Sequence, residues 1–204
     1  MTGGPTADDL PLLGEPAPVE LANSLYGEGD ERVDFLATPA LARLWLDHAD
    51  LAVPFPARLS RTDTDRLRAL RDAVRRLVDQ AVDGVALAPE AVEVVNRAAR
   101  LAPRAAQLAP GPAAGWVSAA RGVDAALGAL AHETVALLGG PDGARLRRCA
   151  APDCGMAFVQ QHRRRRWCHD SCGHRMRQAA YDRRRAAALP AASGDRGDRR
   201  RARP

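Results

Sequence analysis

The chain has 204 residues, 46% of them apolar and only 4% aromatic, which suits one ordinary domain or one domain plus a small module. All 30 basic residues are arginine, so a Walker A loop and a pyridoxal phosphate Schiff base are both excluded, and we expect a bacterial protein. Since it has no apolar run of about 18 residues and no leader pattern, we expect a soluble cytoplasmic protein without a membrane partner.

The net charge of +5 is divided unevenly along the chain. Residues 1–144 carry 13 arginines and 20 acidic residues, a net charge of −7. Residues 145–204 carry 17 arginines and 5 acidic residues, a net charge of +12. The basic part predicts a polyanionic partner, and the alternative is a basic tail without a specific partner.

The first half of the chain predicts helices. Residues 19–25 are a short apolar strand or helix, and Thr38-Pro39 begins a helix as N-cap and first helical residue. Residues 63–83 place their apolar side chains on one helical face, and Gly84 is suited to end that helix in the left-handed conformation.

Prolines and glycines divide the next segment. Pro89 begins a helix that Pro103 ends, and residues 103–115 predict a loop or short hairpin. Residues 116–138 then predict a long apolar helix. We therefore expect a mainly α chain with four segments: a disordered N-terminus at 1–17, a helical bundle at 18–142, a small module with all four cysteines at 143–188 and a disordered basic tail at 189–204.

The four cysteines lie in two close pairs, with the spacing C-x4-C-x13-C-x3-C. This spacing predicts one structural Zn²⁺ ion in a closed tetrahedral site, whose ligands are Cys149, Cys154, Cys168 and Cys172. The alternatives are two disulfides or replacement of a ligand by His162, His169 or His174.

The residues around the cysteines predict a treble-clef-like order of knuckle, β-hairpin and helix. Gly155 is free to adopt a positive φ in the knuckle, residues 156–159 and 164–167 would form the hairpin, and Cys172 would lie in the first turn of a helix ending near residue 188.

Arginines surround this predicted finger, and their planar guanidinium groups suit phosphate oxygens and guanine edges. Nucleic acid is therefore the expected partner, and duplex DNA is favoured because the predicted helix has few aromatic residues. The candidate contact residues are Arg163, Arg164, Arg165, Arg166, Arg175, Arg177, Arg183 and Arg184.

The finger resembles the CGNR zinc finger. The resemblance rests on residues 147–155, on Arg166-Trp167-Cys168 and on Cys172-Gly173-His174-Arg175, where His174 stands in place of the family's Asn. The chain before the finger resembles the N-terminal helical ABATE domain of the same family, through Leu21-Ala22-Asn23-Ser24-Leu25 and more diffuse later blocks. The resemblance implies a transcription regulator linked to stress responses.

Several functions remain open. The first is a DNA-binding regulator whose helical domain senses a small-molecule effector or forms a homodimer, with Asn23, Trp45, Arg71 and Asn96 as candidate pocket residues. The alternatives are an RNA-binding module and a redox or zinc sensor that uses the four thiolates.

We do not expect an enzyme. His132-Glu133 begins an H-E-x-x-H pattern, but position 136 is Ala, so the second metal ligand is missing. The sequence also has no G-x-S-x-G motif and no complete dinucleotide-binding fingerprint.

Overall fold

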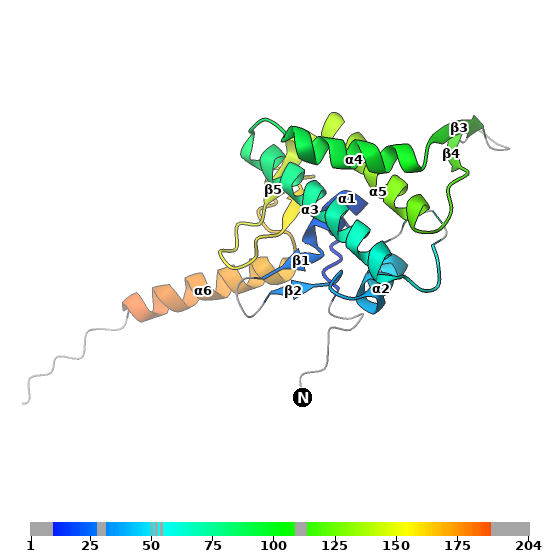
Figure 1. Cartoon of the computed structure of the whole chain (residues 1–204). Coiled ribbons are helices and arrows are strands. Elements are labelled where there is room, and N and C mark those ends of the chain that lie inside the picture. The colour runs from blue at the N-terminus through cyan, green and yellow to red at the C-terminus, as the bar shows by residue number, and fades with distance from the viewer. Residues whose placement is uncertain are drawn as a thin grey trace, which may run out of the picture.

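The computed structural model describes residues 10–27, 32–49, 51, 53, 55–108 and 114–188. The disorder expected for residues 1–9 and 189–204 lies outside this part of the chain. The described elements follow the order α1 Ala17–Asn23, β1 Leu25–Tyr26, β2 Val33–Asp34, α2 Pro39–His48, α3 Arg61–Asp83, α4 Pro89–Leu101, β3 Arg104–Leu108, β4 Ala114–Ser118, α5 Gly122–Gly139, the 3₁₀ helix η3 Gly143–Arg145, β5 Leu146–Arg148, β6 Ala157–Val159 and α6 Asp170–Ala188. The predicted mainly helical chain with a small cysteine-bearing finger is confirmed (Figure 1).

Helix α3 runs through the middle of the body and contacts α1, α2, α4 and α5. Its start is defined by a capping box, in which Ser60 accepts from the Asp63 backbone N–H and Asp63 accepts from the Ser60 N–H. Its end is the predicted left-handed glycine, Gly84, with φ of 67°. Leu67, Leu70 and neighbouring apolar side chains of its buried face form the centre of the main core.

Helices α4 and α5 pack so closely that one position requires glycine. A Cβ atom on Gly128 of α5 would lie 2.1 Å from Cβ of Ala102, which caps the C-terminal end of α4. The missing side chain therefore sets the spacing of the two helices. Within the described part of the chain, no helix combines the length and the apolar character needed to cross a membrane.

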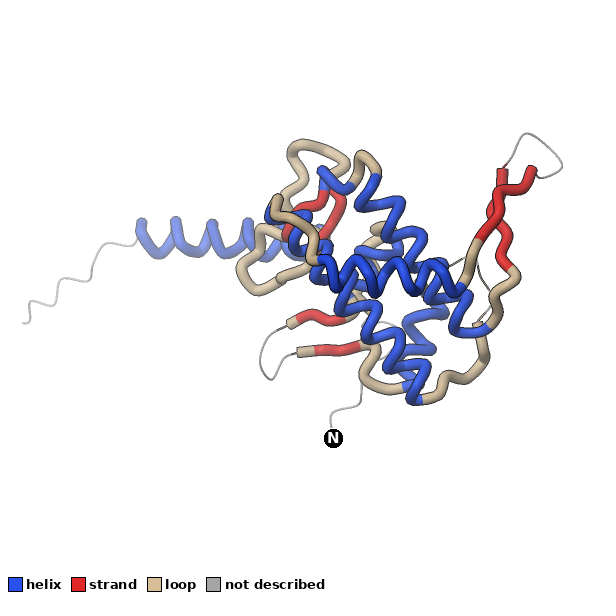
Figure 2. The backbone as a smooth tube through the Cα atoms, turned by 45° about the horizontal axis from the view of Figure 1, so that its top comes forward, coloured by secondary structure: helices blue, strands red, loops and turns tan. Residues whose placement is uncertain are grey.

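The described residues form three two-stranded antiparallel sheets, β1–β2, β3–β4 and β5–β6. In the β3–β4 hairpin, Arg104 pairs with Ser118 and Ala106 pairs with Trp116. Figures 1 and 2 show this hairpin and α6 projecting from different sides of the molecule. The body between them thus separates the hairpin from the cysteine-bearing finger.

The prediction of a helix from residue 116 is wrong at its start, because residues 116–118 belong to β4 and α5 begins at Gly122. The Arg104 guanidinium lies 4.7 Å from the Trp116 ring centroid, which joins the two strands. Gly122 has a φ of 64°, a conformation that turns the chain sharply before the helix. The apolar run is therefore divided between strand β4 and helix α5.

The N-terminal segment also differs from expectation, because residues 10–16 pack against the body although we expected disorder up to residue 17. Leu13 packs beside the cysteines, and Glu15 is buried. Glu20 of α1 holds the segment in place, since its Oε1 accepts hydrogen bonds from the backbone N–H groups of Leu13 and Glu15, both at 2.7 Å. A nearby carboxylate therefore supplies the order that the segment's composition does not suggest.

We expect Gly128→Ala to destabilise the protein although alanine favours helices. The new methyl group meets Ala102 Cβ at 2.1 Å, and such overpacking costs about 1–3 kcal/mol. Gly139→Ala is the matched control, because a Cβ atom at that end of the same helix meets nothing within 4 Å. Urea unfolding should show a lower midpoint for Gly128→Ala only. Equal midpoints for both variants would contradict the close contact.

Candidate metal centre

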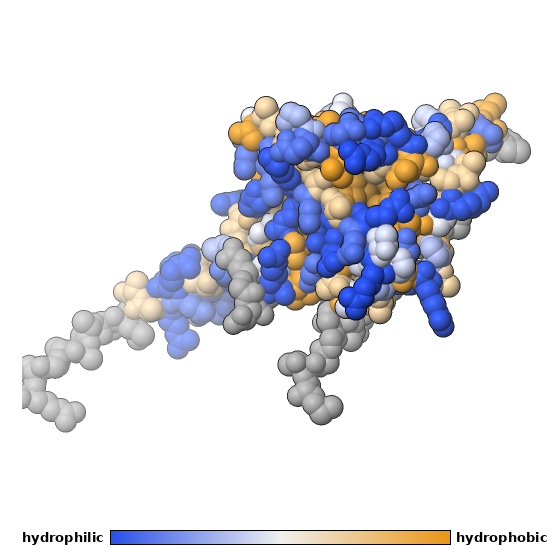
Figure 3. All heavy atoms as spheres, viewed as in Figure 1, coloured by the Kyte–Doolittle hydropathy of each residue, from blue (hydrophilic) through white to orange (hydrophobic). Residues whose placement is uncertain are grey.

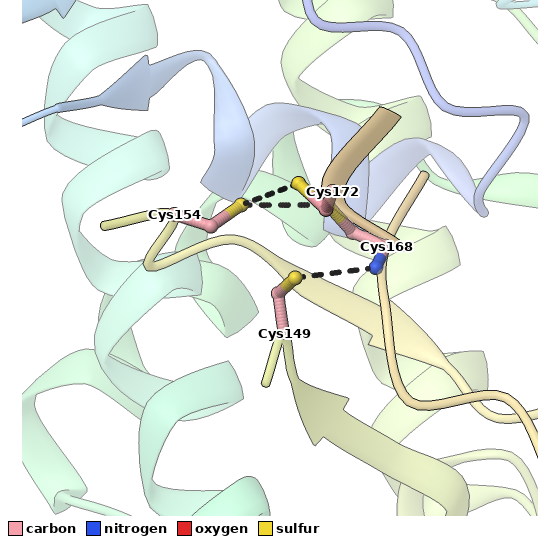
Figure 4. A group of neighbouring side chains, drawn as sticks. All are labelled: Cys149, Cys154, Cys168 and Cys172. Atoms are coloured by element: carbon pink, nitrogen blue, oxygen red, sulfur yellow. Dashed lines mark hydrogen bonds between the residues drawn. The ribbon is translucent and has the colours of Figure 1, made fainter. Parts of the chain in front are cut away.

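The sulfur atoms of Cys149, Cys154, Cys168 and Cys172 all lie within 4.8 Å of one another. They point toward one another from separate elements, as Figure 4 shows. Cys149 follows β5 and Cys154 lies in the knuckle, whereas Cys172 is in the first turn of α6, as predicted. The folded chain thus brings together donors that are up to 23 positions apart in the sequence.

The sulfur separations fit a tetrahedral metal site. Cys154 Sγ lies 3.4 Å from Cys168 Sγ and 3.7 Å from Cys172 Sγ, and the last two sulfurs are 3.8 Å apart. A tetrahedron with metal–sulfur bonds of about 2.3 Å has edges of about 3.8 Å. A disulfide needs a separation of about 2.05 Å, so these are four free thiols around a metal site and not two disulfides.

The protonation behaviour of these thiols shows why a cation belongs there. A hydrogen bond from Cys168 is the main reason that the pKa of Cys154 falls to about 5. Burial, together with the charge on Cys154, raises the pKa of Cys172 to about 11, and the pKa of Cys168 is also raised. The negative charge of one thiolate therefore opposes deprotonation of the neighbouring thiols, and a divalent cation would offset this repulsion.

The backbone around the cysteines forms the predicted knuckle. Gly155 has a φ of 66°, and the Cys149 N–H donates to the Met156 carbonyl at 2.8 Å. The Cys168 N–H donates to Cys149 Sγ at 3.4 Å, and Arg175 Nη2 lies 3.8 Å from Cys172 Sγ. These donors stabilise negative charge on the sulfurs.

The predicted hairpin is wrong in its pairing. Strand β6 pairs with β5, placing Leu146 opposite Val159 and Arg148 opposite Ala157. Residues 164–167 form no strand, and their link to the knuckle is a hydrogen bond from the Ala150 N–H to the Arg166 carbonyl. The segment before Cys149 is therefore the true partner strand, because it continues directly from the helical body.

The other edge of β6 is satisfied by side chains from the front of the chain. Asn23 acts like a short strand, since its Nδ2 donates to the Ala157 carbonyl and its Oδ1 accepts from the Ala157 N–H, both at 3.0 Å. Glu15 Oε2 accepts from the Val159 N–H at 2.8 Å. These contacts attach the finger to the helical body. We had named Asn23 as a candidate pocket residue, and the structure instead places it at this strand edge.

Among the four consecutive arginines, Arg165 is turned inward. Its Nη2 lies 2.6 Å from Glu15 Oε1 and donates to the Cys168 carbonyl at 2.7 Å, and its guanidinium lies 4.6 Å from the Phe158 ring centroid. The Glu15 side chain is only 1% exposed. The sequence predicts Arg165 as a nucleic-acid contact, whereas the structure places its guanidinium between the cysteine centre and the N-terminal segment.

The other candidate arginines are exposed at the surface of the finger. None of them forms an ion pair with another residue that the structure describes, although Arg177 lies over the Trp167 ring at 5.9 Å. The surface over α6 is mostly hydrophilic (Figure 3). The exposed candidates are Arg163, Arg164, Arg166, Arg175, Arg177, Arg183 and Arg184.

The remaining candidate pocket residues do not meet in one cavity. Arg71 is 3% exposed and binds both carboxylate oxygens of Asp34, at 2.7 and 3.2 Å. Burial opposes ionisation of Asp34, but the hydrogen bonds from Arg71 and the Leu36 N–H, together with the positive charges of Arg71 and Arg68, outweigh burial and lower the pKa of Asp34. Trp45 is fully buried in the core, and Asn96 is half-buried on α4.

The three nearby histidines are all exposed and lie outside the sulfur cluster. His169 Nδ1 is hydrogen-bonded to Ser171 at the start of α6, at 2.9 Å. His174, which stands in place of the family's Asn, lies on the exposed side of α6. Sequence reasoning missed Glu15, because nothing local distinguishes it within a proline-rich segment.

Two family models match the chain. The model described as "ABATE: Putative stress-induced transcription regulator" matches residues 15–141, which is more than half of the chain. The model described as CGNR zinc finger matches residues 145–185. No curated protein matches the chain.

We expect Arg165→Gln to destabilise the zinc-loaded protein far more than Arg163→Gln. Removing one partner of a buried ion pair leaves the other charge uncompensated, which costs about 3 kcal/mol. Arg163 is an exposed residue of the same run, so its replacement should change the free energy of unfolding by less than about 0.5 kcal/mol. Urea unfolding measures both values, and similar losses would contradict the inward position of Arg165.

Glu20 predicts a pH dependence of stability. Burial raises the pKa of Glu20 from 4.5 to about 7. The contribution of protonated Glu20 to the free energy of unfolding is therefore fully present below pH 4.5 and is lost as the pH rises to about 7. Glu20→Gln keeps an oxygen acceptor for the Leu13 and Glu15 N–H groups and removes the titration. Across this range the wild type should lose about 3 kcal/mol more unfolding free energy than Glu20→Gln.

The exposed carboxylate Glu93 provides the control for this measurement. Glu93→Gln should retain the wild-type dependence on pH in denaturant unfolding at a series of pH values. If Glu20→Gln also retained it, Glu20 would be ionised in the folded protein.

Proposed function

Because the chain belongs to the ABATE family and carries a CGNR zinc finger, we propose that it is a zinc-dependent, DNA-binding transcription regulator. The observation that carries this proposal is the set of exposed finger arginines without a carboxylate partner among the described residues. In the helical body, by contrast, many arginines pair with acidic side chains, as Arg71 does with Asp34 and Arg100 does with Glu93. Unpaired guanidinium groups on one module are suited to a polyanion.

We propose one structural Zn²⁺ ion bound by the four cysteines. Four protein ligands close the coordination sphere, so the ion would hold the knuckle to the first turn of α6 and would leave no position for substrate or water. When bound, zinc supplies positive charge that stabilises the thiolates. The chain's own Cys168 and Arg175 donors, which face sulfur atoms, would orient and stabilise those ligands.

Helix α6 is the proposed DNA-reading element. Its 19 residues span about 28 Å, and residues 181–187 are exposed on every side. Arg183, Arg184 and Arg185 are consecutive, so they spread around most of the helix circumference. A helix of this kind fits the major groove of duplex DNA, where arginine can contact phosphates and guanine edges.

We further propose that the helical domain senses an effector or forms a homodimer, and that the protein is not an enzyme. The incomplete H-E-x-x-H pattern adds nothing to catalysis in this proposal, since His132 donates to the Ala102 carbonyl and Ala136 carries no metal-binding group. RNA binding and redox sensing by the thiolates are outcomes that the experiment below distinguishes.

The test is a selection from random duplex DNA by the purified, zinc-loaded full chain, with an RNA pool as competitor. An enriched DNA motif supports the proposal, and a two-fold symmetric motif supports a dimer. Retention of RNA in preference to DNA would overturn it in favour of an RNA-binding module. Metal release by mild peroxide, without any nucleic-acid retention, would favour the sensor.

We expect replacement of Arg183, Arg184 and Arg185 by Gln to weaken DNA binding and flatten its salt dependence. Each lost phosphate contact changes the log–log slope by about 0.9. The matched control replaces Arg58, Arg61 and Arg97 by Gln. These arginines are exposed on the helical body, so their replacement removes the same amount of positive charge. Fluorescence anisotropy across a salt series measures both, and equal slopes in the two triple variants would contradict the proposed surface.

The metal should be required for this binding. Cys168→Ser, or removal of zinc by a chelator, should abolish DNA binding while most of the helical circular dichroism signal remains, because most residues of the main core come from the helical body and not from the finger. Full DNA affinity in the metal-free protein would show that the finger is not the contact surface.

A further inference from the structure

A second candidate site lies at the base of the β3–β4 hairpin, apart from the cysteine cluster. It is a cavity of about 730 Å³, bordered by the hairpin, by α5 and by Ala49, Leu51 and Val53. Ligand-binding cavities in proteins commonly have volumes of about 300–1,000 Å³. Its polar and aromatic lining includes Glu15, Arg104, Trp116, Arg121, His132 and Glu133.

Small apolar side chains leave this space open. Ala102 at the end of α4 and Ala125 and Ala129 of α5 line the cavity, together with Ala49 after α2. Trp116 borders the same space and is 62% exposed, although most large apolar side chains of the body are buried. An alanine-lined space beside an accessible indole ring favours a flat, apolar ligand body.

Two arginines and two glutamates line the cavity, and both glutamates already have arginine partners, one of them the Arg165 of the finger. Arg104 lies 3.6 Å from Glu133, and the Glu15 carboxylate is occupied by Arg165. Arg121 has no carboxylate partner among the described residues. Its Nη1 donates to the Ala119 and Ala120 carbonyls at 3.1 and 3.0 Å, which anchors the guanidinium at the cavity.

The ring of His132 is held in place at the cavity by a hydrogen bond to the backbone. Its Nε2 lies 3.0 Å from the Ala102 carbonyl oxygen, and since a carbonyl only accepts hydrogen bonds, Nε2 must carry a proton. His132 is thus held in place beside Arg104 and Glu133 without contributing negative charge. A single anionic group is what the remaining Arg121 charge can bind.

From this arrangement we propose that the cavity binds a small aromatic carboxylate. The ligand ring lies against Trp116 and the alanines, and its carboxylate pairs with Arg121. This proposal names the ligand class for the effector role above, and its binding step is independent of DNA binding.

One wall of the cavity belongs to the segment that holds the finger. Glu15, Pro16 and Ala17 line the cavity, while the Glu15 carboxylate binds the Val159 N–H and Arg165. A ligand that orders this wall therefore also stabilises the attachment of β6. The coupling between ligand binding and finger attachment rests on the proposed function, because it regulates DNA binding only if the finger binds DNA. The binding step itself does not rest on it.

Isothermal titration calorimetry with the zinc-loaded full chain tests the binding step. The probes are indole-3-acetate and its uncharged analogue indole-3-acetamide. We expect saturable binding of the acid, at least about tenfold tighter than the amide, because a carboxylate–guanidinium hydrogen bond is charge-assisted. The proposal would be overturned if the acid showed no saturable binding up to about 10 mM, a Kd weaker than ordinary effectors need. Equal affinity for the two probes would overturn it as well.

Two variants and one control locate the site. Arg121→Gln should remove the preference for the acid, and Trp116→Ala should weaken both probes. Arg97→Gln removes an exposed charge of α4 that does not line the cavity, so it should bind as the wild type does. Thermal unfolding checks that each variant is folded. Wild-type binding by folded Arg121→Gln and Trp116→Ala would place the ligand elsewhere.

Hydrogen exchange tests the coupling without depending on DNA. Saturating indole-3-acetate should slow exchange in the peptide that contains Ala157 and Val159, whose N–H groups donate to Asn23 and Glu15. Unchanged exchange at full occupancy would overturn the coupling. If the chain bound no DNA, the DNA-binding proposal would fail, while calorimetry and exchange would still support or overturn this site.

Discussion

The second backbone edge of β6, which no strand pairs, is the constraint on which the arrangement of the molecule depends. A strand of three residues pairs on one side with β5, and its other polar groups need partners because Ala157 and Val159 are buried. Asn23 and Glu15 provide those partners from the front of the chain. The finger therefore cannot move independently of the helical body without exposing this edge.

Alternate residues of β6 also join two apolar clusters. Ala157 and Val159 belong to the main core of the helical body, whereas Phe158 packs with the cysteines. This follows from the alternation of side chains along a strand. The metal centre and the helical core thus share one strand, and Arg165 joins them again by contacting Glu15, Phe158 and the Cys168 carbonyl.

The division of charge has a corresponding structural division. Arg71 pairs with Asp34 within the body, and Arg148 of β5 pairs with Asp79 of α3, so arginines here join elements to one another. Beyond the second cysteine, the described ion pairs involve Arg165 only. The surplus charge therefore remains at the surface of the finger and α6, where a polyanion could reach it.

Local patterns determined much of this protein. The sequence by itself predicted the helix starting at Thr38-Pro39, the end of α3 at Gly84, the positive φ of Gly155 and the gathering of the cysteines, because each depends on neighbouring residues or fixed spacing. Only the tertiary structure decided the partner of β6, the inward position of Arg165 and the edge contacts of Asn23. Asn23 and Glu15 contact β6 across 134 and 144 positions of sequence. Such pairings depend on which backbone groups the folded core leaves without a hydrogen-bond partner, and no local sequence pattern encodes this.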